Sequence, residues 1–186
     1  MAYDIKNVFY LSTTATVTAS GTDNQGGSAQ LDLSAYIDPI ARGRTKGTGL
    51  AVYKVHFMVS DSAGRPVEAA EDGIMTVSMQ AGLGVGDIAT GGITFDAATL
   101  GNTNALSVAT ANYYGPASYG GAMAAPQMTV EPSEKVPYVI VRDNVCLIYS
   151  TAEGFEKDAL ITVRLECAQI SLDQATLNQL LRTQTV

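Results

Sequence analysis

Few residues of this chain have the types and spacing that catalysis requires. His56 is the single histidine, and a general base would need an orienting partner that the sequence does not identify. The two cysteines, Cys146 and Cys167, lack the CxxC and histidine-rich spacings of zinc sites. Because strand-forming residues flank each cysteine, we expect two buried, unbridged thiols, with a single disulfide as the alternative. His56 is expected to face solvent from a strand.

Aspartates in predicted turns and one glycine-rich segment are the remaining candidates for a ligand site. The aspartates could meet as calcium ligands, but they lack EF-hand spacing, and aspartate is common in turns because it caps nearby backbone N–H groups. Residues 82–86 match neither GxGxxG nor GxxxxGK[ST], and another loop follows them. We therefore expect no metal, no cofactor and no catalytic residue, and an enzyme is the least favoured class. The aspartates are Asp23, Asp38, Asp87 and Asp96.

Length and composition indicate a globular chain with an unusually low charge. A single domain of 186 residues, spanning 1–186, can bury roughly 70% of its unfolded surface. Charged residues make up 16% of the chain, against about a quarter in typical domains. The net charge of −7 argues against a general nucleic-acid binder, and neither a secretory signal nor a membrane span is expected. Such depletion of charge is typical of surfaces that pack against copies of themselves.

Alternating apolar residues predict eight or nine strands. The strongest signal is at residues 49–60, where Ala51, Tyr53, Val55 and two further residues of the same parity share one face. The number and spacing of strands predict an all-β fold, a jelly-roll-like antiparallel β-sandwich, with an immunoglobulin-like sandwich as the alternative. The other predicted strands are 7–20, 28–37, 74–81, 93–95, 123–130, 136–142, 145–150 and 159–170.

The segments 136–142 and 145–150 predict a hairpin around the turn Asp143-Asn144. Both faces of this hairpin are apolar, whereas a strand exposed to water on one side alternates with polar residues. Something must therefore cover the second face, either the same chain or a neighbouring subunit. We assign this face in part to a subunit interface. Its residues are Tyr138, Ile140, Leu147 and Tyr149.

A short helix is predicted at residues 171–183. Ser171 and Gln174 have the spacing of a capping box, and Leu177, Leu180 and Leu181 form one apolar stripe behind it. The last four residues are expected to fray. A helix of this length needs an apolar groove to be stable in water.

A long excursion is predicted between strands at residues 101–120. It is rich in tyrosine, glycine and asparagine, a composition suited to adaptable binding surfaces. From residue 73 to 130 the only charges are Asp87 and Asp96, so we expect this region to be covered by another subunit. Packing of the loop on its own domain is the alternative. Tyr113, Tyr114 and Tyr119 are its interface candidates.

Three of the eleven basic residues form the only basic cluster, in the predicted loop at residues 41–48. Arg42, Arg44 and Lys46 could contact phosphate, either in nucleic acid or on lipid head groups. A solvated loop is the alternative, because three charges bind weakly unless many copies line one surface.

The whole pattern resembles the virion structural proteins of the jelly-roll capsid type. The resemblance rests on about eight strands, low charge, the uncharged excursion, a short N-terminal arm at residues 1–7, and the stretch LDLSAYIDP at residues 31–39. It implies a homo-oligomer, a trimer, pentamer or hexamer that tiles a shell in the virion, and it carries no catalytic residues.

A second hypothesis comes from another class of protein. The chain could be an extracellular or tail-associated binding module, part of an extracellular surface assembly, whose tyrosine loop contacts carbohydrate or a host protein. Aromatic platforms suit sugars, but tryptophan usually leads such sites, and the chain has none.

Overall fold

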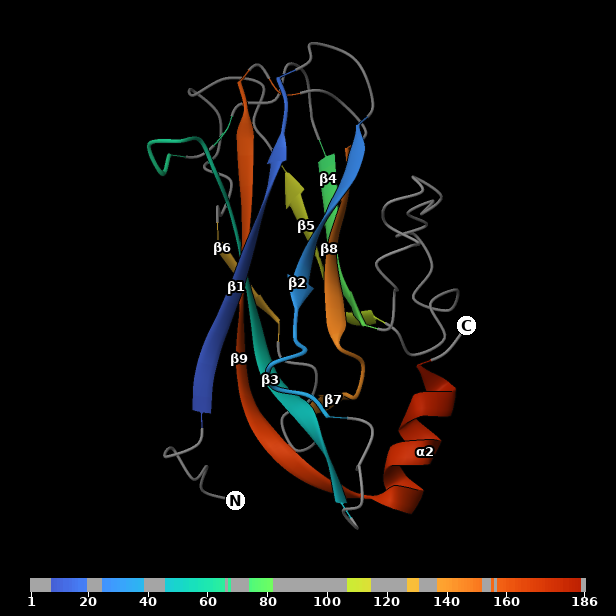
Figure 1. The fold of residues 1–186 in the computed structure, drawn as a ribbon. Coiled ribbons are helices and arrows are strands. Elements are labelled where there is room, and N and C mark those ends of the chain that lie inside the picture. The colour runs from blue at the N-terminus through green and yellow to red at the C-terminus, as the bar shows by residue number, and fades with distance from the viewer. Residues whose placement is uncertain are drawn as a thin grey trace.

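Two antiparallel sheets and one C-terminal helix make up the described part of the chain (Figure 1). The computed structural model describes residues 8–19, 25–38, 46–65, 67, 74–81, 107–114, 127–130, 137–151, 155 and 157–184. The strands are β1 (Val8–Val17), β2 (Gly26–Asp32), β3 (Lys46–Ser60), β4 (Ile74–Ala81), β5 (Ser107–Tyr114), β6 (Gln127–Val130), β7 (Tyr138–Ile140), β8 (Asn144–Thr151) and β9 (Ala159–Asp173), and the helix is α2 (Gln174–Thr183).

The strands pair from the two ends of the chain inwards. β1 pairs with β9, β2 with β8, β3 with β6 and β7, and β4 with β5, always antiparallel. Sheet A has the order β1-β9-β3-β6, with β7 also on β3, and sheet B has the order β2-β8-β4-β5. This nesting is that of a long antiparallel ribbon rolled into two facing sheets, the jelly roll. The predicted fold class is confirmed.

The core lies between the sheets and is built by period-two alternation. In β9, Ile161, Val163 and Leu165 are fully buried while Arg164 is exposed, as the sequence predicts. β1 follows the same rule, because Ala15 and Val17 are buried between exposed threonines. Both cysteines are buried and unbridged, which confirms that prediction.

A β-bulge at Tyr53 changes which residues of β3 face the core. Val52 lies opposite Cys167 and Lys54 opposite Glu166, so Tyr53 is an extra residue in the ladder with β9. Leu50 and Val52 face the core before the bulge, and Val55, Phe57 and Val59 face it afterwards. The prediction that Ala51 and Tyr53 share a face with Val55 is therefore wrong. On the other side of β3, β7 covers residues before the bulge and β6 covers residues after it.

The second strand ends earlier than its alternation predicts. The carboxylate of Asp32 accepts a hydrogen bond of 2.8 Å from the backbone N–H of Ser34, and the N–H of Ile37 donates to the C=O of Leu33 at 3.1 Å. These bonds fold residues 33–37 into a turn, because aspartate competes with the ladder for nearby N–H groups. The predicted strand at 28–37 is correct only as far as Asp32.

The predicted excursion at 101–120 is wrong over its central part, which is strand β5. Residues 107–114 are small or aromatic, and without charge or a strong apolar period they resemble a loop. They pair with β4 along its length, so pairing within sheet B decides their structure. Residues 93–95, predicted as a strand, lie outside the described residues. The predicted strand at 123–130 corresponds to β6.

The predicted hairpin at 136–150 does not form. β7 pairs with β3 in sheet A, whereas β8 lies between β2 and β4 in sheet B. The chain crosses between sheets at residues 141–143, and the C=O of Asp143 accepts a 2.7 Å bond from the N–H of Leu33. An apolar run on each side of a short turn suits two strands on facing sheets as well as it suits a hairpin.

Helix α2 begins three residues later than predicted and is held at both ends. Asp173, not Ser171, caps it, with Oδ1 accepting a 2.8 Å bond from the N–H of Thr176. Leu177 is fully buried and Leu180 and Leu181 are half-buried, so the predicted stripe is confirmed. Figure 1 shows α2 beyond the end of β9, beside the start of β3.

The residue that follows α2 is ordered, contrary to the predicted fraying. The side-chain amide of Gln184 donates to the C=O of Val139 at 2.6 Å and accepts from the N–H of Val141 at 3.1 Å. Gln184 is 3% exposed, and its C=O accepts a 3.2 Å bond from Nε of Arg142. One amide thus satisfies backbone groups that a neighbouring strand would otherwise pair.

Candidate functional site: the surfaces of the two sheets

Tyr113 is a core residue and is not available to a partner. It is 1% exposed, its ring centroid lies 6.3 Å from that of Phe155, and its hydroxyl donates to the C=O of Val67 at 3.0 Å. The N–H of Val67 donates back to the same hydroxyl at 3.3 Å. Tyr113 therefore anchors the connector before β4, and its assignment to a subunit interface is wrong. Of the three tyrosines predicted to form a binding loop, Tyr113 is therefore not available for binding. Tyr119 and the side chain of Tyr114 lie outside the described residues.

The apolar face assigned to a subunit interface is covered by the chain itself. Ile140 and Leu147 are both 0% exposed and belong to the core between the sheets. Tyr149 is 8% exposed, and its hydroxyl donates to the C=O of Thr16 at 3.1 Å. All three side chains are buried within this chain, so the chain itself covers the part of this face that they form. Tyr138 is half-buried, and burial raises the pKa of its hydroxyl to about 12.

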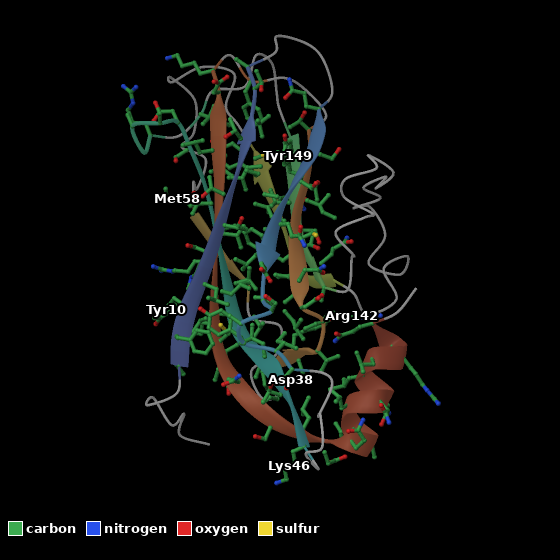
Figure 2. All side chains as sticks on the ribbon, in the orientation of Figure 1. Tyr10, Asp38, Lys46, Met58, Arg142 and Tyr149 are labelled. Carbon is green, nitrogen blue, oxygen red and sulfur yellow. The ribbon has the colours of Figure 1, made fainter. Side chains whose placement is uncertain are left out.

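Glycine at position 27 lets Tyr149 reach across to β1. A Cβ atom on Gly27 would lie 2.5 Å from the hydroxyl oxygen of Tyr149, so any other residue here would displace the tyrosine ring. The side chain of Tyr149 thus runs from β8 over β2 to Thr16 (Figure 2). It joins the two sheets at the end where β1 and β2 approach each other.

Lys46 is the one member of the basic cluster in the described part of the chain. It is exposed at the first residue of β3, opposite Asp173 in the ladder with β9, and Figure 2 places it at the tip of that strand. A hydrogen bond from the N–H of Thr176 holds the pKa of Asp173 below its usual value, so this carboxylate is charged near Lys46. Arg42 and Arg44 lie outside the described residues, and phosphate contact by the cluster stays a prediction.

The outward face of sheet A carries a compact group of charged and aromatic side chains. Nε2 of His56 lies 3.8 Å from Oε2 of Glu166, and both side chains are 23% exposed. The guanidinium carbon of Arg164 lies 5.4 Å from the ring centroid of Tyr10, a cation–π distance. Lys54 lies opposite Glu166 in the ladder. The expected solvent-facing position of His56 is thus partly screened by an acidic neighbour.

The outward face of sheet B is almost without charge. Cys146 and Ile148 point away from the core between the sheets, as their register with Gln30 and Ser28 requires, and yet are 0% and 2% exposed. Among the described residues the charged side chain on this face is Asp32, at the end of β2. The other residues on this face are Ser28, Gln30, Thr76, Ser78, Gln80, Thr110, Asn112, Asn144 and Ser150.

The described side chains offer little for catalysis. No group of three or more metal-binding side chains occurs among the residues that the structure describes. Burial, together with the charge of Glu166, raises the pKa of Cys167 to about 12, so its thiol is protonated at neutral pH and a poor nucleophile. Sγ of Cys167 lies 3.5 Å from the C=O of Phe9, inside the fold. None of the described helices is long and apolar enough to span a membrane.

Comparisons of sequence find no match, whereas comparisons of structure find similar folds. No protein-family model and no curated protein matches the chain. VP1 of Trichodysplasia spinulosa-associated polyomavirus in complex with 3'-sialyllactose has a TM-score of 0.52 at 10% identity, over 90% of this chain and 98% of that one. The same VP1 with sialylated precision glycooligomers gives 0.51 at 11% identity, over 88% and 95%. The chain has the fold of the viral jelly-roll capsid proteins.

A plant virus structure is also similar, at a lower score. Turnip yellow mosaic virus matches with a TM-score of 0.39 at 13% identity, over 89% of this chain and 94% of that one. At identities this low the jelly-roll likeness concerns the fold alone. Sequence reasoning missed two features of this jelly roll, Gln184 and the exposed position of Tyr10, although the uncharged stretch at residues 7–20 was a signal for the second.

Proposed function

We propose that this chain is the structural subunit of a symmetric shell, a viral capsid protein that acts by assembling with copies of itself. The observation that carries the proposal is the jelly-roll order of its sheets, β1-β9-β3-β6 and β2-β8-β4-β5. The likeness to polyomavirus VP1 supports it because it extends over 90% of this chain and 98% of VP1. The role is structural and not enzymatic, and its place is the virion.

The distribution of charge supports self-assembly. Only 16% of the residues are charged, and the ten residues of β1, at the margin of sheet A, include no charged residue. A polar, uncharged surface can be covered by another copy at little electrostatic cost, whereas lysine and glutamate are depleted from protein interfaces because they hold water.

The direction of the subunit in the shell is a further part of the proposal. Lys46 projects at the end of the molecule where α2 begins, and Arg42 and Arg44 precede it by a few residues. If this end faces the cargo, repeated copies of the cluster would bind phosphate groups together, although each copy alone binds weakly.

Electron microscopy of the purified protein tests the proposal. A shell subunit should form closed particles of uniform diameter, and light scattering should give one large mass that does not change on moderate dilution. The measurement should be repeated at low and high salt, because contacts between like-charged subunits weaken at low ionic strength. A folded chain that stays monomeric at every salt and protein concentration would contradict the proposal.

A further inference from the structure

Within the described part of the chain, β1 has a long and regular edge with which no other described strand pairs. β1 is at the margin of sheet A, and within the described part of the chain β9 is its hydrogen-bonded partner. Ten consecutive residues pair with β9 without a shift in register, and none of the ten is charged, proline or glycine. Natural proteins protect edge strands with charges, proline, bulges or short length, because an open edge can pair with another chain.

The other described edges differ from β1 in this respect. β2 begins with two glycines and ends at the charged Asp32, and β6 has four residues. β5 is uncharged, but its ladder with β4 shifts register between Met79 and Gln80. β1 is therefore the one edge among the described strands that lacks every one of these protections.

The backbone of β1 can be assigned to its two sides. In an antiparallel edge strand, residues alternate between bonding the partner and pointing their N–H and C=O groups outwards. The C=O of Thr16 accepts from Tyr149 of sheet B, so Thr16 points away from β9. By alternation Val8, Tyr10, Ser12 and Thr14 also direct their backbone groups away from β9. Near Thr16 the hydroxyl of Tyr149 already bonds to this edge. Within the described part of the chain, the half from Val8 to Ser12 is open.

The open half carries an exposed aromatic side chain. Tyr10 is 59% exposed, the one large hydrophobic side chain exposed in the described part of the chain, and Arg164 lies over its ring. Tyrosine and arginine are enriched where binding energy concentrates in interfaces. Figure 2 shows Tyr10 on the half of β1 that lies away from β2.

We propose that the open half of β1 pairs antiparallel with β1 of a second copy of this chain, around a two-fold axis near Tyr10. Antiparallel pairing of a strand with its own copy satisfies both edges at once and is the isologous contact of a two-fold symmetric pair. The edge carries no charge, so two chains that each carry a net charge of −7 can meet there without direct repulsion. In this register Val8 lies opposite Ser12 of the second copy, and the two Tyr10 side chains are neighbours.

This contact rests on the proposed function in one respect. Pairing of about five residues per copy buries less than the roughly 1,200 Å² of a stable interface, so it acts together with other contacts of the shell. The experiment must therefore be done on assembled protein.

A proline at Ser12 tests the pairing. Because the N–H of Ser12 points away from β9, Ser12→Pro removes a donor from the open edge and leaves the ladder to β9 complete. We expect a folded chain whose particle yield falls at least tenfold, while the matched variant Ser12→Ala assembles like the parent. Normal particle yield from folded Ser12→Pro would overturn the inference.

A cross-link covers the case in which Ser12→Pro does not fold. Tyr10→Cys places two thiols across the axis at about 5.5 Å between Cα atoms, within the range of a disulfide. Both native cysteines are buried, so an oxidised sample should report the new thiol alone. We expect a covalent dimer from Tyr10→Cys particles and none from Thr162→Cys, which lies on the same face of the interior strand β9. Absence of the dimer would overturn the pairing.

The outcomes separate this contact from the proposed function. Particles that form without the cross-link and resist Ser12→Pro would leave the shell function intact and overturn the β1 contact. Cross-linked dimers that never form particles would uphold the contact and contradict the shell function.

Discussion

Tyr113 and Tyr10 carry the same side chain in opposite environments. Tyr113 is 1% exposed and exchanges two hydrogen bonds with the backbone of Val67, whereas Tyr10 is 59% exposed and lies under Arg164. A tyrosine-rich composition suggests a binding surface, but the strand register decides which side chains and backbone groups each tyrosine contacts. The strand register of Tyr113 could not be predicted from the sequence, because the residues around it were expected to form a loop.

Removal of the Tyr113 hydroxyl should destabilise the fold. Tyr113→Phe leaves the N–H and C=O of Val67 without their buried partner, which costs about 1–3 kcal/mol. Urea unfolding followed by circular dichroism measures the change. Tyr10→Phe is the matched control and should unfold like the parent. Equal stability of the two variants would show that Val67 finds another partner.

Burial of Tyr138 should make stability fall in alkaline solution. Its pKa is raised from 10.0 to about 12, so between these values the unfolded chain has lost a proton that the folded chain retains. Stability contributed by the neutral hydroxyl is complete below about pH 10 and is lost as pH rises towards 12. Melting temperatures measured across this window should fall less steeply in Tyr138→Phe than in the parent. A parallel decline would contradict the assignment, and Tyr10→Phe serves as the control.

The elements were predictable where one face of a strand is buried and the other exposed. β1 and β9 follow their alternation, and the apolar stripe of α2 was visible in Leu177, Leu180 and Leu181. Prediction failed where both faces are buried, since β7 and β8 then look alike whichever sheet they join. It also failed at the bulge of β3, because one inserted residue reverses the faces without altering composition.

The link between α2 and β7 should depend on Gln184. Gln184→Ala removes the partners of the C=O of Val139 and the N–H of Val141, and we expect a loss of about 1–3 kcal/mol in unfolding free energy. Gln179→Ala, at an exposed position of the same helix, should be nearly neutral. Limited proteolysis provides a second readout, because a released α2 is cut sooner. Identical cleavage rates in the two variants would argue that Leu177 alone holds the helix.

Two aspartates in the core should unfold the chain, and not merely prevent assembly. Ile140 and Leu147 are both fully buried between the sheets, and an uncompensated buried charge is strongly unfavourable. We expect Ile140→Asp with Leu147→Asp to lose its β-sheet circular dichroism signal. Asn112→Asp with Ser28→Asp, on the outward face of sheet B, should stay folded. A folded monomer from the core variant would show that these side chains can reach solvent.

The whole molecule was predictable in class and not in detail. Strand number, low charge and the lack of catalytic spacing led to a jelly-roll shell subunit, and the order of the sheets agrees with this architecture. The surfaces were assigned less well, because interface residues were chosen by apolarity and the most apolar strands form the interior. None of the ten residues of β1 is charged, and this edge is where we propose a contact between subunits.

The basic cluster should act only in the assembled shell. Arg42→Gln, Arg44→Gln and Lys46→Gln together should leave folding and particle formation unchanged but reduce the nucleic acid retained in purified particles. The difference should shrink as salt rises, because phosphate contacts release counterions. Absorbance at 260 and 280 nm of purified particles measures retention. Equal retention at low salt, or an image that places the loop on the outer surface, would count against this role.

The pairing of the first strand with the last has a consequence for synthesis. Thr14 of β1 hydrogen-bonds to Thr162 of β9, 148 residues further along the chain. Folds dominated by such distant contacts form slowly, since the entropy of closing a long loop is lost before any contact rewards it. On the ribosome β1 lacks this partner until β9 has emerged, so sheet A cannot be completed before β9 has been translated. A chain that ends before β9 would leave both edges of the uncharged β1 without this partner and prone to aggregate.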